Sequence, residues 1–497
     1  MTTSVFFANL AWVLLFANWV FEWNWKEKFA DFRHNYLLQA CLVLVAVHLL
    51  WLIGNDNVLY GLHDCRKKLP LLAIPLVILS SPSLNHCERS CLGVFYVGTI
   101  IVVSFIGLVR WLTMPDLPYR SIVPYISHIR FGMNICLALV ILVYWAFKRH
   151  RLWTVLTASV MALWLMLFLM IIHSYTAFII LLVTAMVLVL VYRCRLPKGT
   201  RIAVISSLSA VIVLCAGLIS YYCYDYFHLR PLSTQPVVAL TSNGNPYTHS
   251  DDDLIENGNY VHRYVCEEEM RREWAKLSKC PIDSITSVGY PIYPALLRYL
   301  NGMGVTKDSL GMTHLTAEDV RAIEKGIANP VYLNPGPRKM VYVLCYEYEN
   351  HRCYHNVSNF SMLQRLELWK NAWHVLWQHP LLGVGTGDVV DACHQRLREI
   401  HSPLADTEFH THDQYLTFLV SFGWFGFLLI VFFFVRAICR THSCHSLFFT
   451  AFLCIVLVSF VSEDTLETLA GILFVSLGYS LLARRNESKP QHEQLTE

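Results

Sequence analysis

Long apolar runs recur along most of this chain, and they constrain its fold more than any other feature. The hydrocarbon core of a bilayer is about 30 Å thick, so a helix needs roughly 20 apolar residues to cross it. Runs that approach or reach this length occupy residues 5–20, 36–54, 69–81, 91–112, 131–147, 152–172, 175–192, 202–222, 415–435, 446–461 and 469–482. With 55% hydrophobic and 15% charged residues among 497, the composition exceeds the apolar content of an ordinary soluble protein. We therefore expect an all-α polytopic membrane protein with about 11 to 12 transmembrane helices.

One long polar stretch, residues 223–414, separates the first eight apolar runs from the last three. It is much too long for an ordinary connection, so we expect a folded and functional loop. The predicted organisation is a set of N-terminal transmembrane helices (1–222), this large loop with an interfacial helix (223–414), C-terminal transmembrane helices (415–483) and a tail (484–497). The first apolar run lacks a basic n-region and a small-residue cleavage site, which favours a retained helix over a signal peptide.

The basic residues report topology. The net charge of +3 is too small to indicate nucleic-acid binding. In the second half of the chain the basic residues fall in every second gap, which the positive-inside rule assigns to the cytoplasm; they are Lys148, Arg149, Arg151, Arg193, Arg195, Lys198, Arg201, Arg436, Arg440, Arg484 and Arg485. The long loop then lies on the opposite face, which is the periplasm in a bacterium. Arg66, Lys67 and Lys68 fall outside on a strict count, which leaves the crossings before residue 112 and the side of the N-terminus open.

The sixteen cysteines lack the paired spacing of a zinc site, and no metal site is predicted. Several lie inside apolar runs, where a thiol behaves as a small hydrophobe: Cys41, Cys136, Cys215 and Cys454. Five lie in the polar loop and are candidates for disulfides if the loop faces an oxidising compartment: Cys266, Cys280, Cys345, Cys353 and Cys393. The sequence leaves their connectivity open.

An amphipathic helix is predicted over residues 362–378. One face carries Leu366, Trp369, Trp373, Leu376 and Trp377, whereas Arg365, Glu367, Lys370 and Asn371 point away from it. Tryptophan is favoured at headgroup depth, so the helix suits the membrane interface. The pattern fits equally well a helix packed on the loop's own core.

Three glycines follow this helix, in Gly383-Val384-Gly385-Thr386-Gly387. A dinucleotide-binding fingerprint requires a preceding buried strand and a βαβ unit, and this cluster follows a helix that ends at a proline. The glycines instead indicate a turn whose bare backbone approaches a ligand or another helix. A tight turn without further meaning is the simpler alternative.

His412 lies where the polar loop returns to apolar sequence. The ordinary pKa of histidine suits proton abstraction near neutral pH, although a single interfacial histidine is more often structural and His410 competes for the role. Arg365 supplies a permanent guanidinium that can bind a phosphate through two hydrogen bonds. A base and a phosphate-binding group at a membrane surface suggest transfer from a lipid phosphate or diphosphate donor.

The stretch from Ser361 to Gly423 resembles the C-terminal signature of the O-antigen ligase and polymerase superfamily. The resemblance rests on Arg365 and Trp369, on Pro380 followed by the glycine cluster, and on His412-Asp413-Gln414-Tyr415-Leu416. In that family a histidine precedes a glycine by eleven positions, as His412 precedes Gly423. The segment from Ser462 to Thr468, followed by Gly471, is similar to Bacteroidetes members.

The resemblance implies a cofactor-free and metal-independent glycosyltransferase of the bacterial inner membrane, with its active site on the periplasmic face. His412 would deprotonate an acceptor hydroxyl, which attacks the anomeric carbon of a glycan on undecaprenyl diphosphate. Arg365 would bind the diphosphate and stabilise it as it leaves. Lipid A core is the expected acceptor, and a growing polysaccharide or a protein is the alternative.

The chain departs from the family pattern at one position. Family members often carry an arginine after a serine at the periplasmic end of a middle helix, where this chain has Ser174-Tyr175. Arg130 is the candidate for the missing cation, and a snorkelling interface arginine is the alternative. Glu463 and Asp464 are candidates to orient the histidine or bind sugar, although two acids in a helix connection are usually only solvated. Asp413 is expected to cap the incoming helix. Further substrate-binding candidates from the motif are Gly383, Gly385, Gly387, Gln414 and Tyr415.

A transporter is the alternative from a different class. It would require ionisable residues near the middle of membrane spans, and usually repeated halves. Nearly all charges of this chain lie between the apolar runs, which favours the enzyme.

Overall fold

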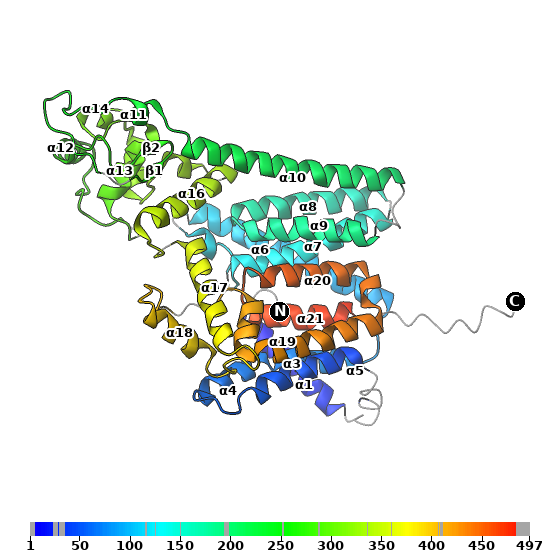
Figure 1. The fold of residues 1–497 in the computed structure, drawn as a ribbon. Coiled ribbons are helices and arrows are strands. Elements are labelled where there is room, and N and C mark those ends of the chain that lie inside the picture. The colour runs from blue at the N-terminus through cyan, green and yellow to red at the C-terminus, as the bar shows by residue number, and fades with distance from the viewer. Residues whose placement is uncertain are drawn as a thin grey trace. The chain divides into compact units, whose positions relative to one another are not determined.

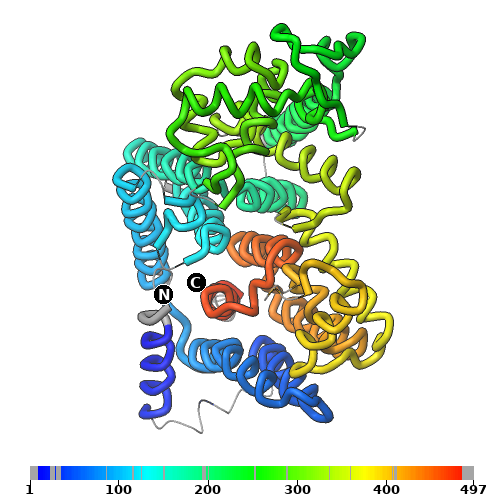
Figure 2. Tube along the Cα trace, turned by 90° about the vertical axis from the view of Figure 1, so that its left-hand side faces the viewer, coloured from blue at the N-terminus to red at the C-terminus, as the bar shows by residue number. Residues whose placement is uncertain are grey.

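The computed structural model describes residues 5–22, 28, 35–114, 117–124, 126–149, 151–192, 198–250, 253–286, 289–334, 336–358, 360–405, 407 and 411–483 (Figures 1 and 2). The chain forms two compact units. We call residues 1–205 and 368–497 the bundle unit, and residues 206–367 the lobe unit. His410, Arg193, Arg195 and the tail from residue 484, with Arg484 and Arg485, lie outside the described residues.

Each predicted apolar run forms a helix. In the bundle unit these helices are α1 (Val5–Phe21), α3 (Tyr36–Leu50), α5 (Pro70–Ser80), α6 (His86–Thr113), α7 (His128–Arg149), α8 (Leu152–Ile171), α9 (Tyr175–Tyr192), α19 (Gln414–Thr441), α20 (Leu447–Phe460) and α21 (Leu469–Leu482). The eighth run lies within α10 (Lys198–Phe227), which crosses the boundary between the units. Among the described residues, six helices are long and apolar enough to span a membrane, namely α6 to α10 and α19. The all-α polytopic membrane fold is confirmed.

Helices distant in the sequence pack side by side in the bundle unit. Figures 1 and 2 show α19 along α3, α21 along α5 and α20 along α9. Short 3-10 turns lie between helices at η2 (Tyr119–Ser121), η5 (Ser443–His445) and η6 (Thr465–Glu467). The apolar core draws on both halves of the chain, with Phe131, Phe168, Phe422 and Phe452 fully or almost fully buried. This packing brings the connection between α20 and α21 next to the start of α19.

A helix of the first half that was not predicted explains the ambiguous topology there. The helix α4 (Val58–Lys68) ends at a lysine that is only 3% exposed. Its ammonium contacts the carboxylates of Asp64, at 2.6 Å, and of Glu467 in η6, at 2.9 Å. Lys68 therefore lies at the same end of the bundle as the α20–α21 connection. The strict count had already assigned Lys68 and that connection to one side, and no extra crossing is needed to explain the lysine.

The lobe unit has a small core of its own. Its elements are α11 (Pro231–Thr234), β1 (Ile255–Glu256), β2 (Asn259–Tyr260), α12 (Glu267–Leu277), α13 (Ile292–Met303), α14 (Ser309–Met312), α15 (Ala317–Glu324), η4 (Pro330–Leu333) and α16 (Pro337–Tyr354). The two strands pair antiparallel, Ile255 opposite Tyr260. Trp274, Leu296, Tyr299 and Ile323 are buried against one another's helices. The predicted folded loop thus holds a lobe around its own hydrophobic core.

From Leu368 on, the polar stretch belongs to the bundle unit and packs with its helices. It consists of α17 (Ser361–Gln378), which enters the bundle unit at Leu368, and α18 (Val389–Glu399). Leu376 and Ala372 are fully buried, whereas Trp373 and Trp377 are 45% and 59% exposed. The helix therefore has an exposed tryptophan face and a packed face. The packed face lies against α18 and α19 and not, as in one of the two interpretations, against the core of the polar loop, and the membrane-interface interpretation stays a prediction. Asn371, predicted to face away, is buried and donates to the carbonyl of Cys393 at 3.0 Å.

Candidate functional site

His412 occupies a sharp bend immediately before α19. Its φ of 54° is in the left-handed region, which a β-carbon makes unfavourable. The next residue, Asp413, is the N-cap of α19, and its carboxylate accepts a hydrogen bond from the amide of Leu416 at 2.9 Å. The predicted cap is confirmed. Burial raises the pKa of Asp413. The bend and the cap together fix the backbone direction at His412.

Asp464 holds this bend from the α20–α21 connection. One carboxylate oxygen accepts the backbone N–H of His412 at 2.8 Å, and the other accepts the hydroxyls of Thr411 at 3.1 Å and Thr417 at 2.8 Å. Asp464 is 5% exposed. A carboxylate that accepts hydrogen bonds from three groups is strongly oriented, and such charge-assisted bonds are stronger than neutral ones. The prediction that Asp464 orients the histidine agrees with these contacts at the level of the backbone.

A second set of contacts joins the same two segments one turn further on. The side chain of Gln414 accepts the amide of Leu466 at 2.7 Å and donates to Glu467 at 3.3 Å. Glu467 in turn pairs with Lys68. Burial alone would raise the pKa of Glu467, but the lysine charge outweighs it and lowers the pKa to about 2. Gln414, expected to bind substrate, is fully buried and bonded to protein on both sides.

Asp64 shares the ammonium of Lys68 with Glu467. Burial, and then the neighbouring charge of Glu467, raise the pKa of Asp64 to about 6, although the lysine opposes the shift. The two carboxylates also raise the pKa of Lys68 against the effect of burial. Near neutral pH this cluster holds two carboxylates and one ammonium, so the bundle end that carries His412 is negatively biased there.

Arg130, at the start of α7, lies against the same connection. Its guanidinium is 3.8 Å from the carboxylate of Glu463, a long distance for an ion pair. Its Nε is buried and has no hydrogen-bond partner among the described residues. The structure thus brings Arg130, Glu463, Asp464 and His412 to one end of the bundle unit. A loosely paired guanidinium with an unused donor is suited to bind an oxyanion.

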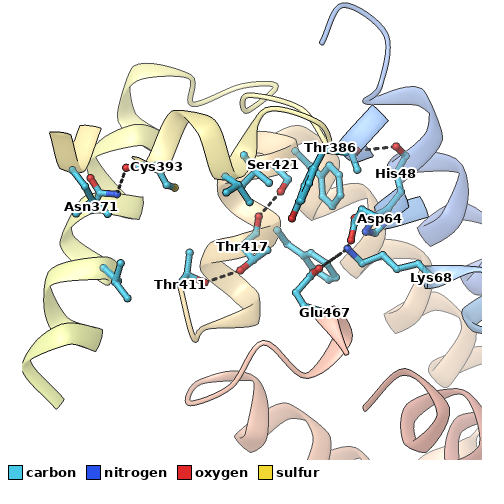
Figure 3. A pocket seen from close by; sticks show the side chains of 17 residues that line it. His48, Asp64, Lys68, Asn371, Thr386, Cys393, Thr411, Thr417, Ser421 and Glu467 are labelled. Atoms are coloured by element: carbon cyan, nitrogen blue, oxygen red, sulfur yellow. Dashed lines mark hydrogen bonds and ion pairs between the residues drawn. The ribbon is translucent and has the colours of Figure 1, made fainter. Parts of the chain in front are cut away.

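A small cavity lined by both polar and apolar side chains lies beside Thr411, the residue before His412 (Figure 3). It is lined by residues from α3, α4, α17, α18, α19 and η6, including His48, Asn371, Thr411 and Ser421, with Lys68 between Asp64 and Glu467 at its edge. Its volume of about 40 Å³ is far below the roughly 300–1,000 Å³ typical of ligand pockets. One water needs roughly 10–15 Å³ on this measure, so the cavity suits a few water molecules and not a sugar.

Three buried polar atoms of the cavity lining have no hydrogen-bond partner among the described residues. They are Nε2 of His48, Oδ1 of Asp64 and Oδ1 of Asn371. Buried polar groups are almost always hydrogen-bonded to protein or to ordered water. The cavity and these atoms therefore fit an internal water site beside the bend.

The glycine turn packs on α19 at Gly423, the glycine eleven positions after His412. Gly383 and Gly423 both have positive φ, 68° and 61°. A β-carbon on Gly383 would lie 2.4 Å from the carbonyl oxygen of Val420, and one on Gly423 would lie 2.3 Å from that of Leu381. The amides of Val384 and Gly385 donate to the carbonyls of Val420 and Ser421, each at 2.9 Å. The two backbones cross in direct contact, which only glycine permits.

The other two glycines of the turn approach the segment after α3. A β-carbon on Gly385 or Gly387 would clash with the side chain of Asn55 or the backbone of Asn57. Asn55 itself accepts the amide of Gly387 at 2.7 Å. The expected substrate contact of Gly383, Gly385 and Gly387 is therefore replaced by a packing role, because protein atoms fill the space before each α-carbon. Tyr415, also a substrate-binding candidate, donates to the carbonyl of Leu457 at 2.9 Å.

Arg365 lies in the second turn of α17, three residues before Leu368, which lines the cavity. It is half-buried and belongs to the lobe unit, whereas His412 belongs to the bundle unit. The predicted competitor His410 lies outside the described residues. In the described part of the chain, no group of three His, Cys, Asp or Glu residues is arranged to hold a metal ion.

Residues 349–431 match the family model described as O-antigen ligase. The match supports the O-antigen ligase superfamily over this part of the chain. The matched region contains Arg365, the glycine turn, His412 and Gly423, so it includes the residues on which the resemblance rests. No curated protein matches the sequence. The match supports glycosyltransferase-like ligase chemistry, with glycan and lipid-linked substrates at a membrane, at the level of the superfamily.

Sequence reasoning missed Lys68 and Asp64 as partners of the site. Lys68 stands one residue before an apolar run, and Asp64 lies four residues earlier on the same helix face. An ionisable residue this close to an apolar span is a functional or structural signal in a membrane protein. Interpreting the lysine only as a topology signal concealed its role in the packing.

Proposed function

We propose that this protein is an inner-membrane glycosyltransferase that transfers a glycan from a polyprenyl diphosphate carrier to an acceptor hydroxyl. The preferred acceptor is lipid A core, which makes it an O-antigen ligase in the strict sense. The observation that carries the proposal is the O-antigen ligase match over residues 349–431, with His412 inside it on a braced bend.

His412 is the proposed general base. Its imidazole takes the proton from the acceptor hydroxyl as the oxygen forms a bond to the anomeric carbon. The bond between that carbon and the carrier diphosphate breaks, and the diphosphate leaves with the electron pair. The contact of Asp464 with the His412 amide supports this role, because a base must be held in position to act.

The diphosphate is proposed to bind Arg365 and Arg130. Both side chains are permanently charged and offer several donors, so they can stabilise the leaving diphosphate without a metal. The support for Arg365 is its position in the matched region. The support for Arg130 is its free Nε and its long contact with Glu463, in the same connection that holds the His412 bend.

The active site is proposed to face the periplasm of a bacterial cell. The basic residues Lys198 and Arg201 at one end of α10, and Arg436 and Arg440 near the end of α19, favour the cytoplasm for those ends. The exposed Trp373 and Trp377 fit headgroup depth at the opposite face.

The test is His412→Ala in cells whose surface polysaccharide is separated on a gel, with purified protein assayed for transfer from a polyprenyl-diphosphate glycan. We expect capped lipopolysaccharide to disappear and transfer to fall by at least about 100-fold. His401→Ala is the matched control, because His401 also has a positive φ and is exposed at the end of α18. His410→Ala tests the competing histidine.

The same experiment distinguishes the acceptors. Loss of capping with intact long chains on the carrier indicates a ligase, loss of chain length indicates a polymerase, and loss of modified protein indicates a protein O-oligosaccharyltransferase. Unchanged glycoconjugates with normal levels of folded His412→Ala protein would refute the enzymatic proposal.

A further inference from the structure

Two thiols from distant parts of the chain lie in contact within the lobe unit. The sulfur of Cys345, in α16, is 3.9 Å from the sulfur of Cys223, in the last turns of α10. The two residues are 122 positions apart in the sequence, so the fold and not the local chain brings them together. Their separation in space is close to van der Waals contact, and a rotation about a side-chain torsion changes such a distance by ångströms.

The junction around this pair is well defined. Tyr226 of α10 packs edge-to-face on Tyr342 of α16, with ring centroids 5.2 Å apart. Asp225 accepts hydrogen bonds from the hydroxyl of Tyr342 and from Arg338, the latter at 3.0 Å. Apolar and charged contacts on both sides of the thiols thus hold α10 and α16 together, and the sulfurs meet without a change of fold.

The chain places this junction at the end of α10 that leaves the membrane. A 30-residue helix is about 45 Å long, more than the roughly 30 Å of a bilayer core. Basic residues mark its N-terminal end, whereas its last turns carry an aromatic belt typical of the opposite interface: Tyr221, Tyr222, Tyr224 and Tyr226. Cys223 lies within this belt and just beyond the predicted span of residues 202–222. If α10 has the orientation given under the proposed function, both thiols face an oxidising compartment.

We propose that Cys223 and Cys345 form a disulfide in the mature protein, which ties the exit of α10 to α16. This inference rests on the membrane orientation in the proposed function but not on its chemistry. The oxidant is the disulfide of a periplasmic thiol oxidase. The thiolate of Cys223 attacks that disulfide, and the oxidase's first sulfur leaves as a thiol. Cys345 then loses its proton and attacks the Cys223 sulfur, releasing the second oxidase thiol, so two protein thiols are oxidised and one disulfide is reduced.

The environment of the two thiols supports this order of events. Cys345 is only 7% exposed, and burial raises its pKa to about 12, so it is an inert thiol until a partner is presented to it. Cys223 is half-exposed and is therefore the accessible member. Oxidation would close a loop that spans most of the lobe, and cross-links across long loops are the more stabilising ones.

The experiment traps free thiols in intact cells with N-ethylmaleimide, and the full-length protein is then purified and digested without reductant. We expect a Cys223–Cys345 linked peptide by mass spectrometry, which disappears after treatment with dithiothreitol. The unmodified protein should also lose on the order of 5 °C of Tm in dithiothreitol, and the Cys223→Ser and Cys345→Ser variants should show no such shift. Maleimide on both residues would overturn the proposal.

A second reagent distinguishes the absence of the disulfide from a wrong membrane orientation of the lobe unit. Cys280 is exposed in the same unit, so a membrane-impermeant maleimide applied to cells with a permeabilised outer membrane should label it. Labelled Cys280 with free Cys223 and Cys345 refutes the disulfide alone. Unlabelled Cys280 that becomes labelled only after lysis places the lobe in the cytoplasm and refutes both the disulfide and the proposed location of the active site.

Discussion

At the scale of single residues, Asp464 is the contact on which the geometry of His412 depends most. It joins the bend to the α20–α21 connection through the amide of His412 and the hydroxyls of Thr411 and Thr417. In Asp464→Asn, an NH₂ group at the position of the oxygen that accepts the His412 amide would set N–H groups against each other, and an amide oxygen there would make only a neutral hydrogen bond. If His412 is the base, as proposed, Asp464 is a positioning residue that acts on the reaction through the backbone of His412.

We predict that Asp464→Asn lowers kcat by about 10-fold or more and leaves the donor KM nearly unchanged, because a lost charge-assisted bond is worth roughly 1.5–3 kcal/mol. Transfer assays on purified protein with varied donor concentration measure the two constants. Glu399→Gln on α18 is the control, since the exposed carboxylate of Glu399 contacts Gln395 and Arg396 of its own helix and lies outside the His412 bend. An increase in KM at constant kcat would mean that Asp464 contacts substrate instead.

At the scale of elements, the crossing of the glycine turn over α19 fixes how the polar stretch returns to the membrane. The turn lies in hydrogen-bonding contact with Val420 and Ser421, and the φ of Gly423 breaks the helical geometry of α19 at this point. The amides of Trp424 and Phe425 consequently donate to the carbonyls of Pro380 and Leu381, at 2.8 and 3.0 Å. The backbone groups released by the kink in α19 are therefore satisfied by the turn, as burial in a membrane protein demands.

Gly383→Ala should destabilise the protein more than an alanine at another glycine with positive φ, because the added β-carbon also meets the backbone of α19. A β-carbon there would lie 2.4 Å from a backbone oxygen, whereas at Gly54, with φ of 86°, it would meet nothing within 4 Å. Both alanines carry the left-handed penalty of about 1–2 kcal/mol, and only Gly383→Ala adds the clash. We expect Tm in detergent to fall by several degrees more for Gly383→Ala than for Gly54→Ala. Equal shifts would show that the turn moves away at little cost.

Local sequence determined the elements well and their partners poorly. The apolar runs predicted all six described helices that are long and apolar enough to span a membrane, and the Asp413 cap was predictable because a cap depends on residues three apart. The Lys68–Glu467 pair joins residues 399 positions apart, and nothing in the spacing of either residue encodes the other. Likewise, Asn371 lies on the polar side of its helix by pattern, but the neighbouring α18 carbonyl that it binds exists only in the fold.

For the candidate site, too, the sequence predicted the residues but not all of their contacts. Hydropathy and motif spacing located His412, Arg130, Glu463 and Asp464, and the structure brings these four together in one unit. Gly385, Gln414 and Tyr415, predicted from the motif to bind substrate, make contacts within the protein that hold the segments on either side of His412. A sequence motif does not distinguish residues that act on the substrate from residues that hold the fold. The packing of each side chain in the structure is needed to tell them apart.

At the scale of the whole molecule, the two units are stabilised by different means. The bundle unit buries mainly apolar side chains, with its charged cluster confined to one end. The lobe unit buries a polar network around β1: Arg298 makes two hydrogen bonds to Glu256, at 2.8 and 2.9 Å, and the fully buried Lys307 donates to Asn301 and to two backbone carbonyls. Three acceptors match the three donors of an ammonium group. The stability of the lobe should therefore depend on pH in a way that the bundle core does not.

The buried Lys307 determines whether the stability of the lobe rises or falls with pH. Burial lowers the pKa of Lys307 to about 7, and the charge of Glu256 only partly opposes it. In the unfolded chain the pKa is about 10.4, so between pH 7 and 10 the unfolded lobe binds more protons than the folded one. Lobe stability should rise with pH in this window, by up to about 1.4 kcal/mol per unit, and lose this gain as pH falls toward 7. Hydrogen exchange of α13 peptides in the full-length protein at pH 7 and pH 9, corrected for intrinsic rates, measures the effect. Lys307→Met should abolish the pH dependence. Lys325→Met, which changes an exposed lysine of the same unit, should retain it. Equal protection of the wild-type lobe at pH 7 and pH 9 would mean that the three acceptors keep the Lys307 ammonium charged at both pH values.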